Sequence, residues 1–232
     1  MKKLFALGCV LFLFSVQICF AQTDVTADIS GKIGVGFYGG GFFPDGTEFF
    51  GEDIDVGKTG TYGGSITWGV NRFFALEVSA DRNEPEIDST LLNINYGECR
   101  TVPLTLTMQF RYVGKAPEYY DNMAVYFLGG VGYYFNSYNV SKELKQYWAN
   151  QGYNVTIDME DGFGFHVGLG VEAFLTENLA LNLEVRRHWA DADIKETLTS
   201  IENPSYAITL KDDVDLNFTQ VILGFKLYFS MF

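Results

Sequence analysis

Two histidines are the residues of this chain best suited to acid–base chemistry at neutral pH. His166 and His188 would serve as bases in a lipid hydrolase if Ser79 or Glu172 lay within hydrogen-bonding distance of them. Nothing in the spacing of these four residues places a nucleophile beside a base, and histidines that only hydrogen-bond within a protein are far more common. The sequence therefore predicts no catalytic residue and leaves a hydrolase as a remote alternative.

Two other kinds of site, for a dinucleotide and for a metal, are also disfavoured. Gly34 to Gly39 match the pattern G-x-G-x-x-G. That pattern binds a dinucleotide only where a strand turns into a helix, and here it lies inside a segment expected to be a strand. The chain has no HExxH motif and no cluster of Cys and His with zinc-ligand spacing. We therefore expect no cofactor and no metal.

The start of the chain has the composition of a secretory signal peptide. Lys2 and Lys3 precede an apolar run over 4–20, and Ala21 follows where a signal peptidase requires a small residue. We predict that residues 1–21 are removed and that residues 22–232 form one domain. Cleavage would remove two of the three cysteines and leave Cys99 alone, so no internal disulfide would form.

The predicted mature chain is strongly acidic. Taking Lys2 and Lys3 from the 16 basic residues leaves 14 against 29 acidic residues, a formal charge of −15. Nucleic-acid binding requires a basic surface, so we exclude nucleic acid as a partner. The best candidate for a membrane helix after the signal peptide, 123–135, has only 13 residues and contains three glycines. It is too short to cross a bilayer as a helix.

Eight segments of the chain alternate between apolar and polar side chains. A period of two gives a β-strand two different faces. In the last segment Val221, Leu223, Phe225 and Phe229 share one face, and Lys226 lies on the other. Each segment is long enough for a tilted strand to cross a bilayer. The segments are 28–42, 62–70, 73–80, 102–112, 123–135, 162–174, 179–187 and 221–229.

The two faces and the loop lengths favour a barrel in a membrane over a soluble β-sandwich. An apolar outside opposite a polar inside is typical of a transmembrane β-barrel, and so is the alternation of long external loops with short periplasmic turns. Closure also leaves no free sheet edge in lipid. We predict an all-β fold, a single eight-stranded antiparallel transmembrane β-barrel. Its long loops would be 43–60, 81–101, 136–161 and 188–215.

The inward faces carry charges of both signs. Side chains about fill the interior of an eight-stranded barrel, and charges there are costly unless they are paired. We therefore expect a plugged or constricted lumen, in which Glu77 pairs with Arg111 and Lys226 meets Glu184 or Glu172. A lipocalin-like soluble barrel would instead have an apolar interior. The predicted lumen charge network is Lys32, Glu77, Arg111, Glu172, Glu184, Arg186 and Lys226.

Aromatic residues gather where the strands meet the short turns. Such rings prefer the membrane–water interface, so we predict that they form a periplasmic girdle. In the last strand we expect Phe229 rather than Phe232 to face lipid, because the opposite register would turn Lys226 outward. The predicted girdle consists of Trp68, Phe74, Phe110, Tyr112, Phe225 and Phe229.

The predicted long loops carry two further features. Leu144, Tyr147 and Trp148 predict a short amphipathic helix within 141–152, whose apolar face would cover the barrel mouth. The first two loops are acidic, and their carboxylates are either simply solvated or bridged by divalent cations to the phosphates of lipopolysaccharide. These carboxylates are Asp45, Glu48, Glu52, Asp53, Asp55, Glu84, Glu86 and Asp88.

From about residue 100 onward the chain resembles the OmpW family of small outer-membrane barrels. The resemblance lies in VPLTLT (102–107), YFLGGVGYY (126–134), FGFHVGLGV (163–171), NLALNLEVR (178–186) and DVDL (213–216), and in a last strand that ends on Phe. It implies an eight-stranded barrel in the Gram-negative outer membrane that passes small hydrophobic molecules from its lumen to the membrane, and it supplies no catalytic residues. The glycine-rich alternation also fits the wider OmpA/OmpX-like group.

Two functions remain open at this point. The first is OmpW-like passage of small hydrophobic solutes. The second is a structural or surface-interaction barrel of the OmpX type, which acts through its acidic external loops without transport. The expected partners are outer-membrane lipids, lipopolysaccharide, the barrel assembly machinery and, for the first function, small hydrophobic solutes.

Overall fold

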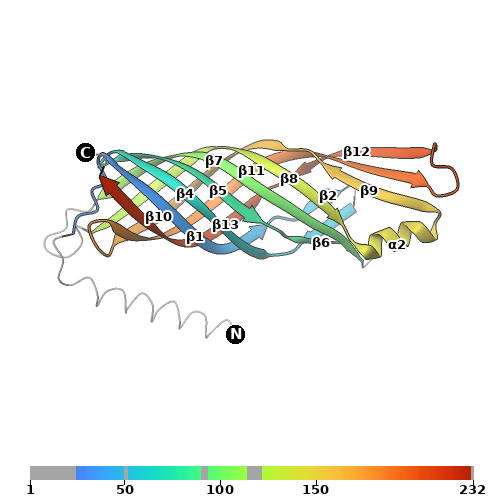
Figure 1. Ribbon diagram of the computed structural model, residues 1–232, viewed down its shortest axis with the longest axis horizontal. Coiled ribbons are helices and arrows are strands. Elements are labelled where there is room, and N and C mark those ends of the chain that lie inside the picture. The colour runs from blue at the N-terminus through green and yellow to red at the C-terminus, as the bar shows by residue number, and fades with distance from the viewer. Residues whose placement is uncertain (1–24, 50–51, 90–93, 114–121, 231–232) are drawn as a thin grey trace, which may run out of the picture.

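The computed structural model describes residues 25–49, 52–89, 94–113 and 122–230 (Figure 1). Within these residues, eight antiparallel strands close into a ring, because β1 pairs with β13 as well as with β4. The predicted barrel is therefore confirmed. In spatial order the ring contains β1 (Lys32–Pro44), β4 (Thr59–Asn71), β5 (Phe74–Asn83), β7 (Asn95–Val113), β8 (Met123–Val140), β10 (Gly162–Phe174), β11 (Leu179–Ser200) and β13 (Phe218–Ser230).

Within the observed strands the two faces point as the alternation predicts, but β1 begins at Lys32 and not at residue 28, and Ile29 is buried inside the ring. Phe37, Leu169 and Phe229 are among the outward side chains and are more than half exposed, whereas inward side chains such as Lys226 are buried. Phe229 thus lies on the outside of the barrel, while Phe232 and the predicted signal peptide lie outside the described residues. Large apolar side chains on the outside and polar ones inside match a wall that faces lipid.

At one end of the ring, the long-loop end, the strands continue well beyond the predicted segments. β11 runs to Ser200 and pairs there with two further strands, and β7 and β8 pair up to Gly97 and Val140. The four segments predicted to be loops therefore contain much strand, which corrects that prediction. The added strands are β2 (Thr47–Phe49), β3 (Glu52–Val56), β6 (Glu86–Ser89), β9 (Tyr153–Met159) and β12 (Ala207–Asp215), at the right of Figure 1.

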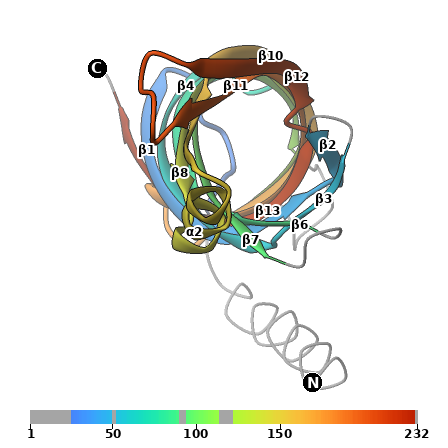
Figure 2. The same cartoon turned by 90° about the vertical axis from the view of Figure 1, so that its right-hand side faces the viewer.

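The predicted amphipathic helix is present as α2 (Lys142–Asn150). Its first turn is capped by Ser141, whose Oγ accepts a hydrogen bond from Leu144 N at 3.0 Å. Leu144 is buried, and the helix packs along β7 and β9. Figure 2 shows it over one side of the ring, where Leu144, Tyr147 and Trp148 pack on the buried cluster of the long-loop end. The apolar face therefore covers part of the mouth and not all of it.

No helix in the described ranges is long and apolar enough to cross a membrane.

At the opposite end, the short-turn end, the first described residues enter the ring. Val25, Ala27 and Ile29 are buried against inward side chains of the barrel, including Phe174 and Tyr228. Gly69 allows this approach, because a Cβ atom there would lie 1.9 Å from the Ile29 carbonyl oxygen. The chain therefore closes this end with its own N-terminal segment, over residues 25–29.

Candidate functional site

Glu77 is the centre of the charge network in the lumen. Its carboxylate lies 2.6 Å from Arg186 Nη2 and 2.7 Å from Lys226 Nζ, and it accepts a hydrogen bond from Thr67 Oγ1 at 2.9 Å. These residues come from β4, β5, β11 and β13, so the contacts cross the interior. All four side chains are at most 1% exposed.

Glu184 extends the network on the side of β11. Its carboxylate lies 2.5 Å from Arg186 Nη2 and 3.7 Å from Lys226 Nζ. The contact between Lys226 and Glu184 is one of the two that were predicted for Lys226. The Tyr126 hydroxyl also donates a hydrogen bond to the Glu184 carboxylate at 2.6 Å. The ring of Tyr126 also occupies the space above Gly170, where a Cβ would lie 2.4 Å from the ring. The Tyr126 ring therefore fills the space that this inward glycine leaves in the lumen.

Arg111 does not pair with Glu77, which corrects that prediction. Its Nη2 lies 2.5 Å from Glu172, and Tyr228 donates to the same carboxylate at 2.7 Å. Gln109 connects the two centres, because its Nε2 donates to Glu77 at 3.1 Å and its Oε1 lies 3.5 Å from Arg111 Nη1.

Lys32 stays apart from the predicted network. It is half-buried at the start of β1, and its Nζ donates to the backbone oxygen of Glu177 at 3.0 Å. The structure thus brings together the other six charges, three of each sign, in a buried cluster with no net charge. Buried charges are tolerated only when paired and hydrogen-bonded, and these six side chains are both paired and buried in the short-turn half of the lumen. The six are Glu77, Arg111, Glu172, Glu184, Arg186 and Lys226.

The two histidines lie one layer further toward the long-loop end. Their rings stack with centroids 5.1 Å apart. His166 Nε2 hydrogen-bonds with Thr107 Oγ1 and His188 Nδ1 with the Tyr134 hydroxyl, both at 2.9 Å. Ser79 instead contacts Thr105 and Arg186. Glu172 contacts Arg111 and Tyr228, so neither of the two residues considered as partners of a histidine base is hydrogen-bonded to His166 or His188 in the described structure.

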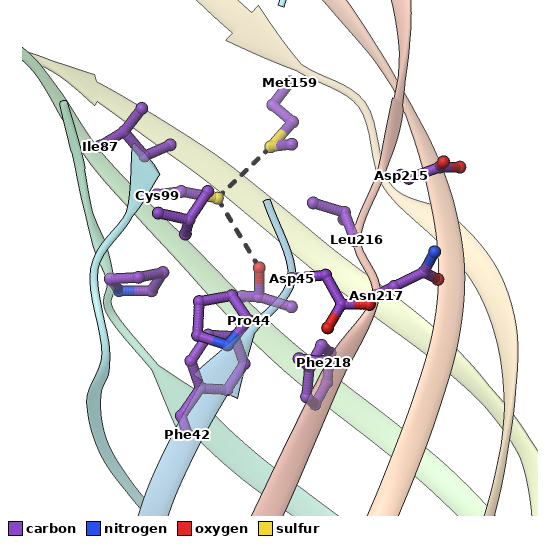
Figure 3. A pocket seen from close by; sticks show the side chains of 13 residues that line it. Phe42, Pro44, Asp45, Ile87, Cys99, Met159, Asp215, Leu216, Asn217 and Phe218 are labelled. Atoms are coloured by element: carbon purple, nitrogen blue, oxygen red, sulfur yellow. Dashed lines mark hydrogen bonds between the residues drawn. The ribbon is translucent and has the colours of Figure 1, made fainter. Parts of the chain in front are cut away.

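Above the histidines the interior becomes apolar. Figure 3 shows Phe42, Ile87, Cys99, Met159 and Phe218 around a small cavity. We call this cavity, of about 30 Å³, the apolar chamber. It adjoins a buried cluster of the extended strands, whose members are Ile54, Ile87, Cys99, Leu144, Val155, Ile157, Met159, Ala192, Ile194, Leu198 and Val214.

Cys99 and Met159 place two sulfur atoms in the wall of the chamber. Their Sγ and Sδ atoms are 3.5 Å apart. Burial raises the pKa of the Cys99 thiol to about 11, so the thiol is neutral at physiological pH. Sequence reasoning missed the chamber because its walls come largely from segments assigned to loops. The apolar residues Val155, Ile157 and Met159 alternate with polar ones, and this pattern could have indicated a further strand with a buried face.

The predicted girdle residues lie on the outside of the barrel toward the short-turn end. Five are exposed by 45% or more, and Phe74 is half-buried with its ring centroid 5.6 Å from that of Phe110. Their position at a membrane interface remains a prediction. The five are Trp68, Phe110, Tyr112, Phe225 and Phe229.

The acidic residues of the long-loop end are divided among several places. Asp45 pairs with Arg187 and Glu84 with Arg82. The side chains of Glu48, Glu52 and Asp53 fall outside the described part. Five aspartates line a shallow surface pocket, yet no group of three or more His, Cys, Asp or Glu side chains in the described ranges is arranged to hold a metal ion. The five are Asp161, Asp191, Asp193, Asp213 and Asp215.

Solved structures with the same architecture are outer-membrane barrels. The outer membrane protein OprG from Pseudomonas aeruginosa is 19% identical, with 89% of this chain and 99% of that chain covered and a TM-score of 0.68. AlkL is 17% identical, with 90% and 94% covered and a TM-score of 0.55. The E. coli outer membrane protein W is 17% identical, with 86% and 98% covered and a TM-score of 0.48. At these identities the likeness is one of fold.

No curated protein matches the chain. Residues 6–229 match the family described as "Outer membrane protein beta-barrel domain". The closed ring with its apolar outside and charged inside is what that family requires. The chain belongs to the outer membrane protein β-barrel family, and its place is the outer membrane of a Gram-negative cell.

Proposed function

We propose that this barrel takes up small hydrophobic molecules from the extracellular side through the apolar chamber. The observation that carries the proposal is the change of the inward face along the barrel. It is apolar around Cys99 and Met159 and fully charge-paired around Glu77 and Arg186. An apolar solute gains free energy on entering the first region, whereas entry into the second would separate buried ion pairs.

The chamber must widen to accept a solute. About 30 Å³ is enough for roughly one water molecule. Met159 supports such a change, because its unbranched side chain adapts to irregular spaces. The chamber also reaches the turns at Asp45 and Asn217, where β1 ends and β13 begins. Asp45 N donates to the Asn217 oxygen at 2.9 Å, and β2 and β12 lie against each other beyond these turns. We place the opening to the outside between those two strands, which have to separate to admit a solute.

A solute that cannot continue downward has to leave through the wall. The β5–β7 ladder runs from Phe74 opposite Phe110 to Ala80 opposite Leu104, and resumes only at Asn83 opposite Thr101. Pro103, which has no N–H to donate, lies in this interval. The interval adjoins Thr101, which lines the chamber. We infer that solutes leave sideways here, into the outer leaflet.

The test measures uptake and conductance together. Cells that produce the protein are expected to take up labelled octane faster than cells without it, while planar bilayers show no ion conductance. Met159→Lys places a charge in the chamber and should abolish the gain, whereas Asp158→Lys, on the exposed side of the same strand, should keep it. Stable conductance steps, or uptake that does not depend on the protein, would contradict the proposal.

A second candidate function is favoured by one feature of the β11–β12 hairpin. Ile201, Tyr206, Ile208 and Leu210 are exposed by 38–53% at its tip. Exposed apolar groups of this kind often mark interaction sites, which would suit a surface-interaction barrel. Replacing Ile208 and Leu210 by serine should then reduce attachment of cells to a surface, with Thr209→Ser on the other face of β12 as the control. Unchanged attachment would remove this candidate.

The membrane contacts, the insertion and the export of the chain are also proposals. We infer that the girdle contacts outer-membrane lipid and lipopolysaccharide, that the assembly machinery inserts the last strand, and that residues 1–21 direct export. None of them requires a catalytic group.

A further inference from the structure

Two sulfur atoms from different strands lie side by side in the wall of the apolar chamber (Figure 3). Cys99 belongs to β7 and Met159 to β9, and both residues are at most 8% exposed. Cys99 Sγ lies 3.5 Å from Met159 Sδ and 3.7 Å from Thr101 Oγ1, and Thr101 also lines the chamber. The chamber thus presents a thiol and a thioether together in apolar surroundings.

Sulfur ligands of this kind select soft metal cations. Thiolates and thioethers suit Cu⁺ and ions like it, whereas carboxylates, carbonyls and water suit Mg²⁺ and Ca²⁺. Two metal–sulfur bonds of about 2.3 Å each, the length found for zinc, span at most about 4.6 Å. The observed separation of 3.5 Å therefore lets one ion contact both sulfur atoms in a bent arrangement. The unbranched side chain of Met159 also allows the wider, linear arrangement.

The size and the polarity of the chamber favour a single monovalent ion. A volume of about 30 Å³ accommodates roughly one water-sized particle, so an ion enters without any widening. On binding, the Cys99 thiol releases its proton to water and its sulfur bonds to the metal, and no electron is transferred. The thiolate and a monovalent cation then have no net charge together, which an apolar site tolerates better than the excess charge that a divalent ion would leave.

Carboxylates are placed where they would gather cations beside the chamber. Asp215 lines the chamber and also the shallow pocket that it forms with Asp161, Asp191, Asp193 and Asp213. Clustered charges of one sign raise the local concentration of ions of the opposite sign. This pocket makes no metal site by itself, but it supplies cations to the side of the chamber at which Asp215 lies.

We propose that Cys99 and Met159 form a binding site for a soft monovalent cation, Cu⁺ or Ag⁺, which is held between their two sulfur atoms in the apolar chamber. The expectation of no metal was based on motifs for zinc, which requires more ligands than a soft monovalent ion does. The site is independent of the passage of hydrophobic solutes, because the ion occupies the chamber at its observed size.

Silver is the probe of choice, because Ag⁺ needs no reductant to stay monovalent. The mature barrel in detergent micelles is titrated with silver nitrate in chloride-free buffer against an excess of free methionine, and bound silver is quantified by mass spectrometry. We expect one Ag⁺ per chain, and an excess of Mg²⁺ should not displace it. X-ray absorption at the silver edge should show two sulfur neighbours and no oxygen or nitrogen neighbour.

Met159→Leu tests the thioether while the side chain stays apolar and similar in size. This variant should bind Ag⁺ about tenfold more weakly or worse, since even residues that only support a metal ligand contribute that much. Its silver should have one sulfur neighbour. Met108→Leu is the matched control, because Met108 is on the outward face of β7, 48% exposed, and should leave binding unchanged. Cys99→Ser should abolish binding.

Heat-modifiable migration on gels shows whether each variant is folded, and Met159→Leu decides if Cys99→Ser does not fold. Unchanged affinity in Met159→Leu, or one sulfur neighbour in the wild type, would mean that the thiol alone reacts with silver and would overturn the site. Oxygen or nitrogen neighbours, or no bound silver, would overturn it as well. Silver binding in a protein that fails to take up octane would support this site and contradict only the proposed function.

Discussion

The Arg111 guanidinium lies 2.5 Å from Glu172 at the short-turn end of the lumen, and both side chains are fully buried. Neither charge has access to water, so each depends on the other for compensation. The pair joins β7 to β10, which are separated in the ring by β8. It therefore acts across the interior and not between neighbouring strands.

Removal of Arg111 should destabilise the barrel strongly. Arg111→Ala leaves Glu172 as an uncompensated buried charge, a change that costs about 3–5 kcal/mol in comparable pairs. Urea unfolding in lipid vesicles measures the loss. Arg82→Ala breaks an ion pair with Glu84 that is partly exposed, and should change stability by less than about 1 kcal/mol. Equal midpoints for Arg111→Ala and wild type would show that the network does not hold the lumen together.

Gly69→Ala should release the N-terminal segment from the ring. The added methyl group would lie 1.9 Å from the Ile29 carbonyl oxygen, so the backbone of residues 25–29 would have to move. We expect faster proteolysis near Val25 in the variant, with the barrel itself intact. Gly60→Ala, where the nearest atom would be 3.9 Å away, is the matched control. The prediction fails if the two variants are cut at the same rate.

Phe229→Asp should impair insertion more than Phe232→Asp. Phe229 is 56% exposed on the outside of β13, where a carboxylate would enter the lipid-facing band. An assembly assay with purified insertion machinery compares the two folded fractions. The reverse ranking would mean that the machinery recognises Phe232 and not the closing ring of the wall.

Pairing of β11 with β12 should strengthen as the pH falls. Asp193 and Asp213 stand opposite each other in this ladder, and their side-chain hydrogen bond and mutual repulsion raise the pKa of Asp213. Because the pKa of Asp213 is higher when β12 is paired, the paired state binds the proton more tightly than the unpaired state. At neutral pH the two carboxylates repel each other, and protonation relieves this repulsion as the pH falls toward the usual carboxyl range near pH 4.

Hydrogen exchange of the β12 amides, corrected for intrinsic rates, follows this effect. Protection should rise between pH 7 and pH 4 in the wild type. Asp213→Asn should already show the higher protection at pH 7 and little further change. A wild-type profile that is flat with pH would contradict the prediction.

The alternation of side chains was sufficient to predict the faces of the strands. It placed Lys226 inward and Phe229 outward, because a period of two leaves only two registers and one of them puts a charge in lipid. It was not sufficient to predict which charges meet. Glu77 stands opposite Thr107 on β7, four residues from Arg111, while Arg186 and Lys226 reach Glu77 across the lumen. The level of each side chain along the barrel axis depends on the shear of the closed ring. The sequence of a single strand does not determine that shear.

The extended strands escaped prediction for a different reason. Around Asp191 and Asp193 the alternation continues through Ala192 and Ile194, but with carboxylates on the outward face. Such a face indicates a solvated loop as readily as a strand outside the membrane. Only the pairing partners β9 and β12 distinguish the two, and they come from separate parts of the sequence.

The length of β11 determines how far the protein projects from the cell. At about 3.3 Å per residue its 22 residues span about 70 Å along the strand, while the apolar band of such a barrel is only about 25 Å tall. With the long-loop end outward, as the loop lengths predict, the hairpin that β11 forms with β12 rises well above the bilayer even with the usual tilt. Its tip is therefore the part of the protein that an antibody or a bacteriophage approaching the cell would meet first.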